Sequence, residues 1–100
     1  MIEISARIGS NEVEVAPRSF DAGKTSFTVL NMGLVPSRLS IDGPTPLTTD
    51  LIQPGETATL RGDMRPGSYE AVALGGEPLS PAEFTVGPKR ESSDSVLLLP

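Results

Sequence analysis

The sequence contains no cysteine and no histidine. These absences exclude a disulfide, a thiolate or imidazole metal ligand, and a nucleophilic site that uses histidine as its base. Aromatic residues are also scarce, at 4% of the chain, so the core must rest on valine, leucine, isoleucine and three phenylalanines. The lack of cysteine does not fix the compartment, because exported proteins can lack it too.

Basic residues are few as well, 8 against 13 acidic ones, which gives a formal net charge of −5. Binding to nucleic acid or to an anionic membrane surface depends on clustered lysine and arginine, so we expect neither partner. No apolar run is long enough to span a bilayer. Residues 1–15 lack the basic start and apolar run of a signal peptide. The protein therefore either stays in the cytoplasm or has had a signal peptide removed.

Glycine and proline, by contrast, are abundant, with ten of each in 100 residues, which favours the many turns of an all-β sandwich or barrel. Two Pro-Gly turns, at residues 54–55 and 66–67, divide the stretch 51–74. The alternation after the second turn places Tyr69 on the inward face of an extended chain. The stretch predicts two antiparallel strands at the centre of a small antiparallel Greek-key β-sandwich.

Alternation elsewhere predicts an edge strand at residues 2–8 and further strands at 12–15, 25–30, 38–42 and 82–86. The side chains expected to face inward are Val13, Val15, Phe27, Val29, Leu39, Ile41, Phe84 and Val86. Residues 43–50 are expected to form a polar connection, and no helix longer than a turn or two is predicted.

One domain fits this length, and we assign the β-sandwich to residues 1–87. Residues 88–100 are expected to form a charged linker followed by an apolar tail, whose apolar residues are Val96, Leu97, Leu98 and Leu99. We expect this tail to pair with a sheet edge or to fit an apolar groove, most readily on a partner subunit. A freely moving tail is the alternative.

The order of the turn motifs resembles the cupredoxin family, the plastocyanin-like copper proteins. Three segments carry the resemblance: Asn31-Met32-Gly33 ahead of a short apolar strand, then Pro54-Gly55-Glu56-Thr57, and Pro66-Gly67-Ser68-Tyr69. Together they extend over most of residues 12–86. The resemblance implies a cupredoxin-like sandwich. An immunoglobulin-like sandwich is the alternative, in which Tyr69 would be a tyrosine corner.

The copper ligands of that family are missing at the matching positions. Ser37 stands where the family has a histidine, and Ala73 lies where the strand leads to a cysteine. The loop before the last strand holds neither the second histidine nor the methionine, and Met32 and Met64 lie outside the ligand positions. A blue-copper site needs a thiolate and two imidazoles, so the sequence implies a copper-free domain without a cofactor.

Other patterns in the sequence are weaker. Residues 61–63 match the integrin-binding tripeptide Arg-Gly-Asp, but Gly-Asp is also ordinary chemistry between two strands of a hairpin, which we favour. Acidic residues that a calcium site would need are scattered singly, at Asp42, Asp50, Glu56, Asp63 and Glu70. No serine has a histidine to activate it, and no carboxylate pair stands out, so we expect no enzyme.

Several apolar residues have no evident place in the core and are candidates for protein binding: Leu34, Val35, Pro36, Leu74, Val96, Leu97, Leu98 and Leu99. The first four should gather at the end that surrounds copper in the family, unless they fold back into the vacated pocket. We therefore expect a non-catalytic structural or protein-binding module. A subunit of a larger assembly, such as a capsid-decorating or filament protein that docks by its tail, is the first alternative. A small hydrolase or metal enzyme is a disfavoured third.

Overall fold

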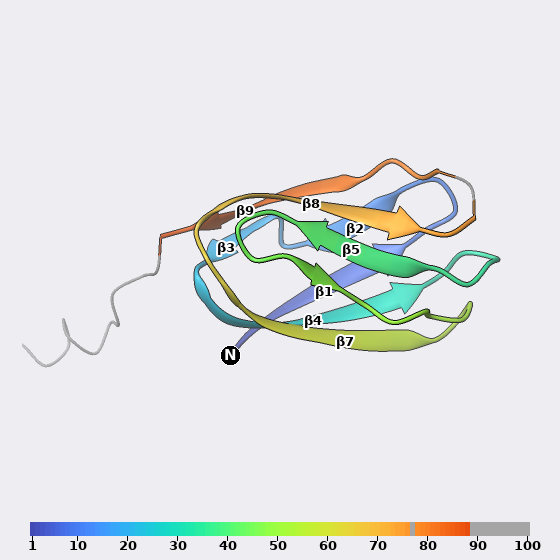
Figure 1. Ribbon diagram of the computed structural model, residues 1–100, viewed down its shortest axis with the longest axis horizontal. Helices are drawn as coiled ribbons and strands as arrows, with labels where there is room; N and C mark the ends of the chain where they lie inside the picture. Colours follow the sequence, from blue (N-terminus) through green and yellow to red (C-terminus); the bar gives the residue numbers. More distant parts are fainter. Residues whose placement is uncertain (77, 89–100) are drawn as a thin grey trace, which may run out of the picture.

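A computed structural model describes residues 1–76 and 78–88, and within them the strands form two sheets packed face to face (Figure 1). The first sheet has the order β2-β1-β4-β7, from Val13–Ala16, Ile2–Ile8, Gly23–Asn31 and Thr57–Met64. The second has the order β3-β9-β8-β5-β6, from Ser19–Asp21, Ala82–Gly87, Gly67–Leu74, Arg38–Asp42 and Leu47–Thr48. No helix in these residues is long and apolar enough to cross a membrane.

The core lies between the sheets and is built by strand alternation. In β4, buried side chains recur at every second residue from Thr25 to Asn31, as a strand with one inward face requires. All eight side chains predicted to face inward are buried: Val13, Val15, Phe27, Val29, Leu39, Ile41, Phe84 and Val86. The predicted two-sheet β-sandwich is therefore confirmed.

Four aromatic rings form one cluster within this core. The Phe84 ring lies between its neighbours, with ring centroids 5.1 Å from Tyr69, 5.7 Å from Phe20 and 5.9 Å from Phe27. The ring planes of Tyr69 and Phe84 are only 6° apart, so the two rings stack. The few aromatic residues of the chain are thus concentrated at one place.

Tyr69 is buried, with 3% of its surface exposed, and its hydroxyl donates a hydrogen bond of 2.6 Å to the carbonyl oxygen of Arg65. The burial was predicted from the sequence. The chain at Gly43 passes so close to the ring that a Cβ there would lie 2.4 Å from Tyr69 Cδ2. Only glycine permits this approach, so the backbone of the turn after β5 packs directly against one side of the Tyr69 ring.

The prediction that the two central strands pair with each other is wrong. The two segments are β7 and β8, but β7 is an edge of the first sheet and β8 lies inside the second. The short connection 65–66 crosses from one sheet to the other. Alternation shows which face of a strand is buried. It does not show which sheet the strand joins, because strands of both sheets turn one face inward.

Three further details differ from the prediction. β1 lies between β2 and β4, so it is not an edge strand. Its pairing with β4 is parallel, as is that of β3 with β9, so neither sheet is purely antiparallel. The short strands β3 and β6 were not predicted. Two or three residues are too few to show alternation, and these strands depend on their neighbours for their geometry.

The connections divide between two ends of the sandwich. Short ones, at residues 17–18, 22, 43–46 and 65–66, lie at what we call the turn end. The others, at residues 9–12, 32–37, 49–56 and 75–81, lie at the loop end, on the right of Figure 1, and three of these four are longer than any connection at the turn end. Pro88 leaves from the turn end, and the predicted linker and tail beyond it lie outside the described residues.

Candidate functional site

The loop that follows β4 is fixed by one buried amide side chain. Asn31 is fully buried, and its Nδ2 donates to the carbonyl oxygens of Val35, at 2.9 Å, and Ile52, at 2.8 Å. Its Oδ1 accepts a bond of 2.8 Å from the backbone N–H of Gly33. A single side chain therefore joins the start of the loop, its tip and the connection 49–56.

Backbone hydrogen bonds tie the same loop down at both of its ends. At the first, the N–H of Met32 donates to the carbonyl oxygen of Ile8 at 2.8 Å. At the second, Ser37 and Ile52 exchange two bonds, at 3.0 and 2.7 Å. The loop is longer than an ordinary turn, yet its backbone is anchored to β1 and to the connection 49–56.

Two glycines bring the chain after β8 against this loop. A Cβ on Gly75 would lie 2.8 Å from the carbonyl oxygen of Pro36, and one on Gly76 would lie 2.5 Å from Val35 Cγ2. Both have positive φ, +115° and +67°, which side-chain-bearing residues rarely adopt. The Gly75-Gly76 pair thus allows a close contact between the chain after β8 and the loop after β4.

The contact closes one side of a groove of about 360 Å³ at the loop end, which we call the loop-end groove. Its apolar walls are Ile8, Leu34, Val35 and Leu79, and its remaining lining residues are all glycine or serine. None of these lining residues, in the part of the chain that the structure describes, carries a charge. The volume is near the lower end of the range for ligand pockets, and the lining offers apolar contact with little electrostatic attraction.

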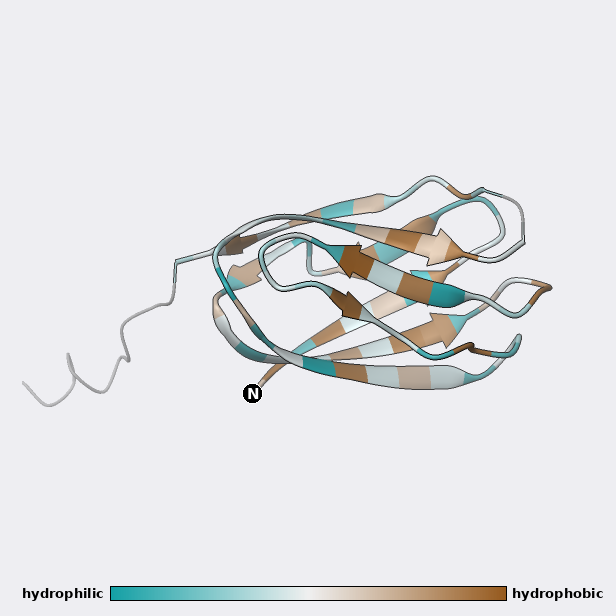
Figure 2. Ribbon diagram, in the orientation of Figure 1, coloured by the Kyte–Doolittle hydropathy of each residue, from teal (hydrophilic) through white to brown (hydrophobic). Residues whose placement is uncertain are grey.

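The candidate binding residues of this loop remain outside the core. Leu34 is 94% exposed and Val35 44% exposed, and Pro36 is also exposed, so the tip does not fold back to fill the vacated pocket. Figure 2 shows the hydrophobic tip of this loop projecting at the loop end. Leu74 is 47% exposed but lies opposite Arg38 in the β5–β8 pairing and does not line the groove.

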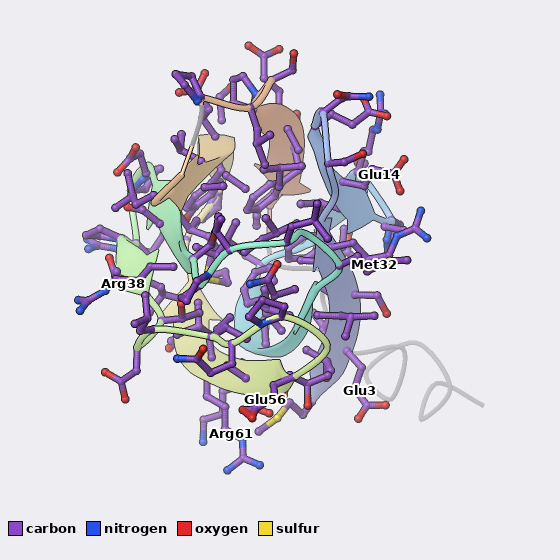
Figure 3. The ribbon with its side chains drawn as sticks, turned by 90° about the vertical axis from the view of Figure 1, so that its right-hand side faces the viewer. Glu3, Glu14, Met32, Arg38, Glu56 and Arg61 are labelled. Carbon is purple, nitrogen blue, oxygen red and sulfur yellow. The ribbon has the colours of Figure 1, made fainter. Side chains whose placement is uncertain are left out.

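Several of the described charged residues lie around the rim of this end. Figure 3 looks onto the loop end, where the side chains of Glu14, Arg38 and Arg61 point away from the middle. Glu14 forms an exposed ion pair with Arg7 across β1 and β2. An apolar centre with a charged rim is the usual distribution of residues in a protein–protein interface.

The positions that the resemblance assigned to copper ligands also lie at this end. Ser37 is buried and lines the groove, and Ala73 is half-buried opposite Leu39, two residues further along β5. Neither side chain is a copper ligand of the blue-copper type. In residues 1–76 and 78–88, no group of three or more acidic, cysteine or histidine side chains could hold a metal ion.

Two predictions about charged residues need correction. The Arg-Gly-Asp tripeptide is not at a hairpin turn but inside β7, where Arg61 pairs with Ser26 of β4. The acidic residues are not all single, because Asp42 lies opposite Glu70, which in turn lies opposite Glu83. The three carboxylates form a row on the outer face of the second sheet, which only the strand register reveals.

Two walls of the groove, Ile8 and Leu79, were not predicted from the sequence. Ile8 was recognised as the end of the first strand, and Leu79 stands alone among glycines and prolines. An isolated leucine in such a loop was the available indication for Leu79. The candidate binding residues 96–99 lie outside the described part of the chain.

Solved structures of two copper proteins resemble this fold. A multicopper oxidase aligns with a TM-score of 0.60 and 16% identity, over 87% of this chain and 41% of that one. A copper-containing nitrite reductase from Thermus scotoductus SA-01 aligns with a TM-score of 0.62 and 18% identity, over 95% of this chain and 29% of that one. This chain therefore spans less than half the length of either protein.

No protein-family model matches the sequence, and no curated protein sequence matches it. The structural similarity defines the fold: the protein is a cupredoxin-like β-sandwich. The resemblance expected from the turn motifs is confirmed at this level, in preference to the immunoglobulin-like alternative.

Proposed function

We propose that this domain is a non-catalytic protein-binding module whose contact surface is the loop end. The observation that carries the proposal is Leu34, a large apolar side chain 94% exposed at the tip of a loop fixed from within by Asn31. An exposed apolar residue on a mobile loop would need no explanation. Here a buried polar network holds the backbone that presents it.

Rigid presentation favours binding, because a loop that is already ordered loses less conformational entropy when a partner docks. The groove beside Leu34 adds apolar surface, and the charged rim keeps the surrounding surface solvated. The partner in this proposal is another protein. Nucleic acid and membranes are not proposed, since the chain is acidic overall.

A structural subunit of a larger assembly, docking through residues 96–99, is the second candidate, and it uses the same surface if the groove receives that segment. A hydrolase or metal enzyme has no observation in its favour. The activities named for the two copper proteins are not proposed for this chain, which has no cysteine or histidine to supply their ligands.

Site-specific photo-crosslinking tests the proposal in extracts of the native cells. The photoreactive residue p-benzoylphenylalanine would replace Leu34, and in a matched control Thr28, which is exposed on the outer face of the first sheet. We expect position 34 alone to give an adduct with one defined protein chain, identified by mass spectrometry.

The adduct should weaken when Val35→Asp is added and persist with Leu51→Asp. The two residues are similarly exposed, at 44% and 49%, but Leu51 does not line the groove. Equal adducts at positions 34 and 28, or none at either, would contradict the proposal.

A further inference from the structure

We infer that the loop-end groove binds the apolar segment Val96, Leu97, Leu98 and Leu99 of a second copy of this chain. The inference rests on the proposed function, because it names the partner of the same surface.

The chemistry of the two surfaces matches. The described walls of the groove are aliphatic, from Ile8, Leu34, Val35 and Leu79, and none of the described residues that line it is charged. The segment 96–99 is aliphatic and uncharged, and the residues before it, 89–95, are polar or charged. Aliphatic side chains gain by leaving water, while the charged residues before them remain solvated outside the groove.

The chain leaves the sandwich far from its own groove. Val86 pairs with Gly67, the first residue of β8, so Pro88 follows at the turn end. The groove lies beyond the other end of β8, at Gly75 and Gly76. The strand between these two points, Gly67–Leu74, spans about 23 Å at the usual rise of a β-strand.

The chain between these points is barely long enough. From Pro88 to Val96 it reaches at most about 28 Å, and only when every residue is fully extended. As a flexible linker the same segment has a typical end-to-end distance of about 16 Å. Binding to its own groove would need a nearly straight linker laid along the sheet, with a large loss of entropy. A second molecule can place its groove beside the segment without this constraint.

The resulting contact joins the turn end of one copy to the loop end of the next. It is heterologous, because the two copies contribute different surfaces, and the pair as a whole keeps one free groove and one free segment. Such contacts continue until they close into a ring or extend into a filament.

A mixing experiment on the full-length chain tests the inference. Val35→Asp alters the groove and leaves the segment intact, while the double variant Leu97→Asp, Leu98→Asp alters the segment and leaves the groove intact. Sedimentation velocity over a range of concentrations measures their assembly. We expect the wild type to grow beyond dimers as concentration rises, and each variant alone to stay monomeric.

An equimolar mixture of the two variants should give a species that stops at the dimer. One copy supplies the only working segment and the other supplies the only working groove. Matched controls carry the same added charges elsewhere: Leu51→Asp outside the groove, and the double variant Ser92→Asp, Ser93→Asp in the linker. Both controls should assemble as the wild type does.

Val35→Ser, checked by circular dichroism and chemical denaturation, guards against misfolding, since it should weaken assembly while leaving the fold intact. A monomeric wild type, a mixture that forms no dimer, or assembly unchanged in both Val35 variants would overturn the inference. If the crosslink at position 34 then identifies a different protein, the inference fails and the proposed function stands. If position 34 also gives no adduct, both fail.

Discussion

The turn end and the loop end of this sandwich are held together by different kinds of interaction. At the turn end, short connections enclose stacked rings, with Tyr69 against Phe84 and the backbone of Gly43 against the tyrosine. At the loop end, the longer connections are joined by the hydrogen bonds of Asn31, and Leu34 is left in solvent.

The difference has a physical consequence. Where apolar packing fixes the structure, the apolar side chains are buried in the core and are not available to form a binding surface. Where a buried polar network fixes the backbone, apolar side chains are free to face outward. Stability and binding should therefore respond separately to substitutions at the two ends.

Tyr69→Ala should cause the largest change in stability, because it removes a ring that is 3% exposed and stacked on Phe84. We expect the free energy of unfolding to fall by about 3–5 kcal/mol, as for other large aromatic truncations in a core. Urea denaturation measures it. Tyr69→Phe, which loses only the bond to Arg65, should cost about 1 kcal/mol. A loss below about 1 kcal/mol for the alanine variant would show that the turn end is not the more tightly packed one.

Asn31→Ala tests the polar network at the loop end. It leaves the N–H of Gly33 without its partner and removes one hydrogen bond from each of the carbonyl oxygens of Val35 and Ile52, which keep their bonds from Ser37. We expect a loss of about 1–3 kcal/mol. Hydrogen exchange at Gly33 should accelerate more than exchange at Tyr69. Equal acceleration at both residues would mean that the two ends are not independent.

Gly76→Ala tests the contact that closes the groove. The positive φ of +67° alone should cost roughly 1–2 kcal/mol. Gly55→Ala is the matched control, since Gly55 also has positive φ, +83°, but nothing lies within 4 Å of its Cβ position. Denaturation curves should show a greater loss for Gly76→Ala, because its Cβ would press on Val35. Equal losses would show that the Val35 contact has no effect on stability.

Leu34→Ser should change stability least, within about 0.5 kcal/mol, because the side chain is already 94% exposed. Assembly or partner binding should nevertheless weaken, because the substitution removes an apolar wall of the groove. Denaturation and sedimentation of the same sample would separate the two effects. Reduced stability with unchanged binding would reverse the comparison between the two ends.

The alternation of apolar residues was enough to predict the inward faces of β2, β4, β5 and β9 and the burial of Tyr69. The turn motifs were enough to indicate the cupredoxin-like fold. For the candidate site, the sequence identified the exposed tip at Leu34 and Val35. It did not identify the walls that complete the groove, because Ile8 and Leu79 are distant in the chain from that tip.

The sequence by itself determined which face of several strands is buried, where the chain turns, and that no thiolate or imidazole site exists, because these depend on residue type and on local spacing. Only the tertiary structure decided that β7 and β8 join different sheets, that Asp42, Glu70 and Glu83 share a row, and that Gly76 lies against Val35. Strand partners are selected by the packing of whole sheets. Two residues can therefore meet across a groove although no pattern in their own segments relates them.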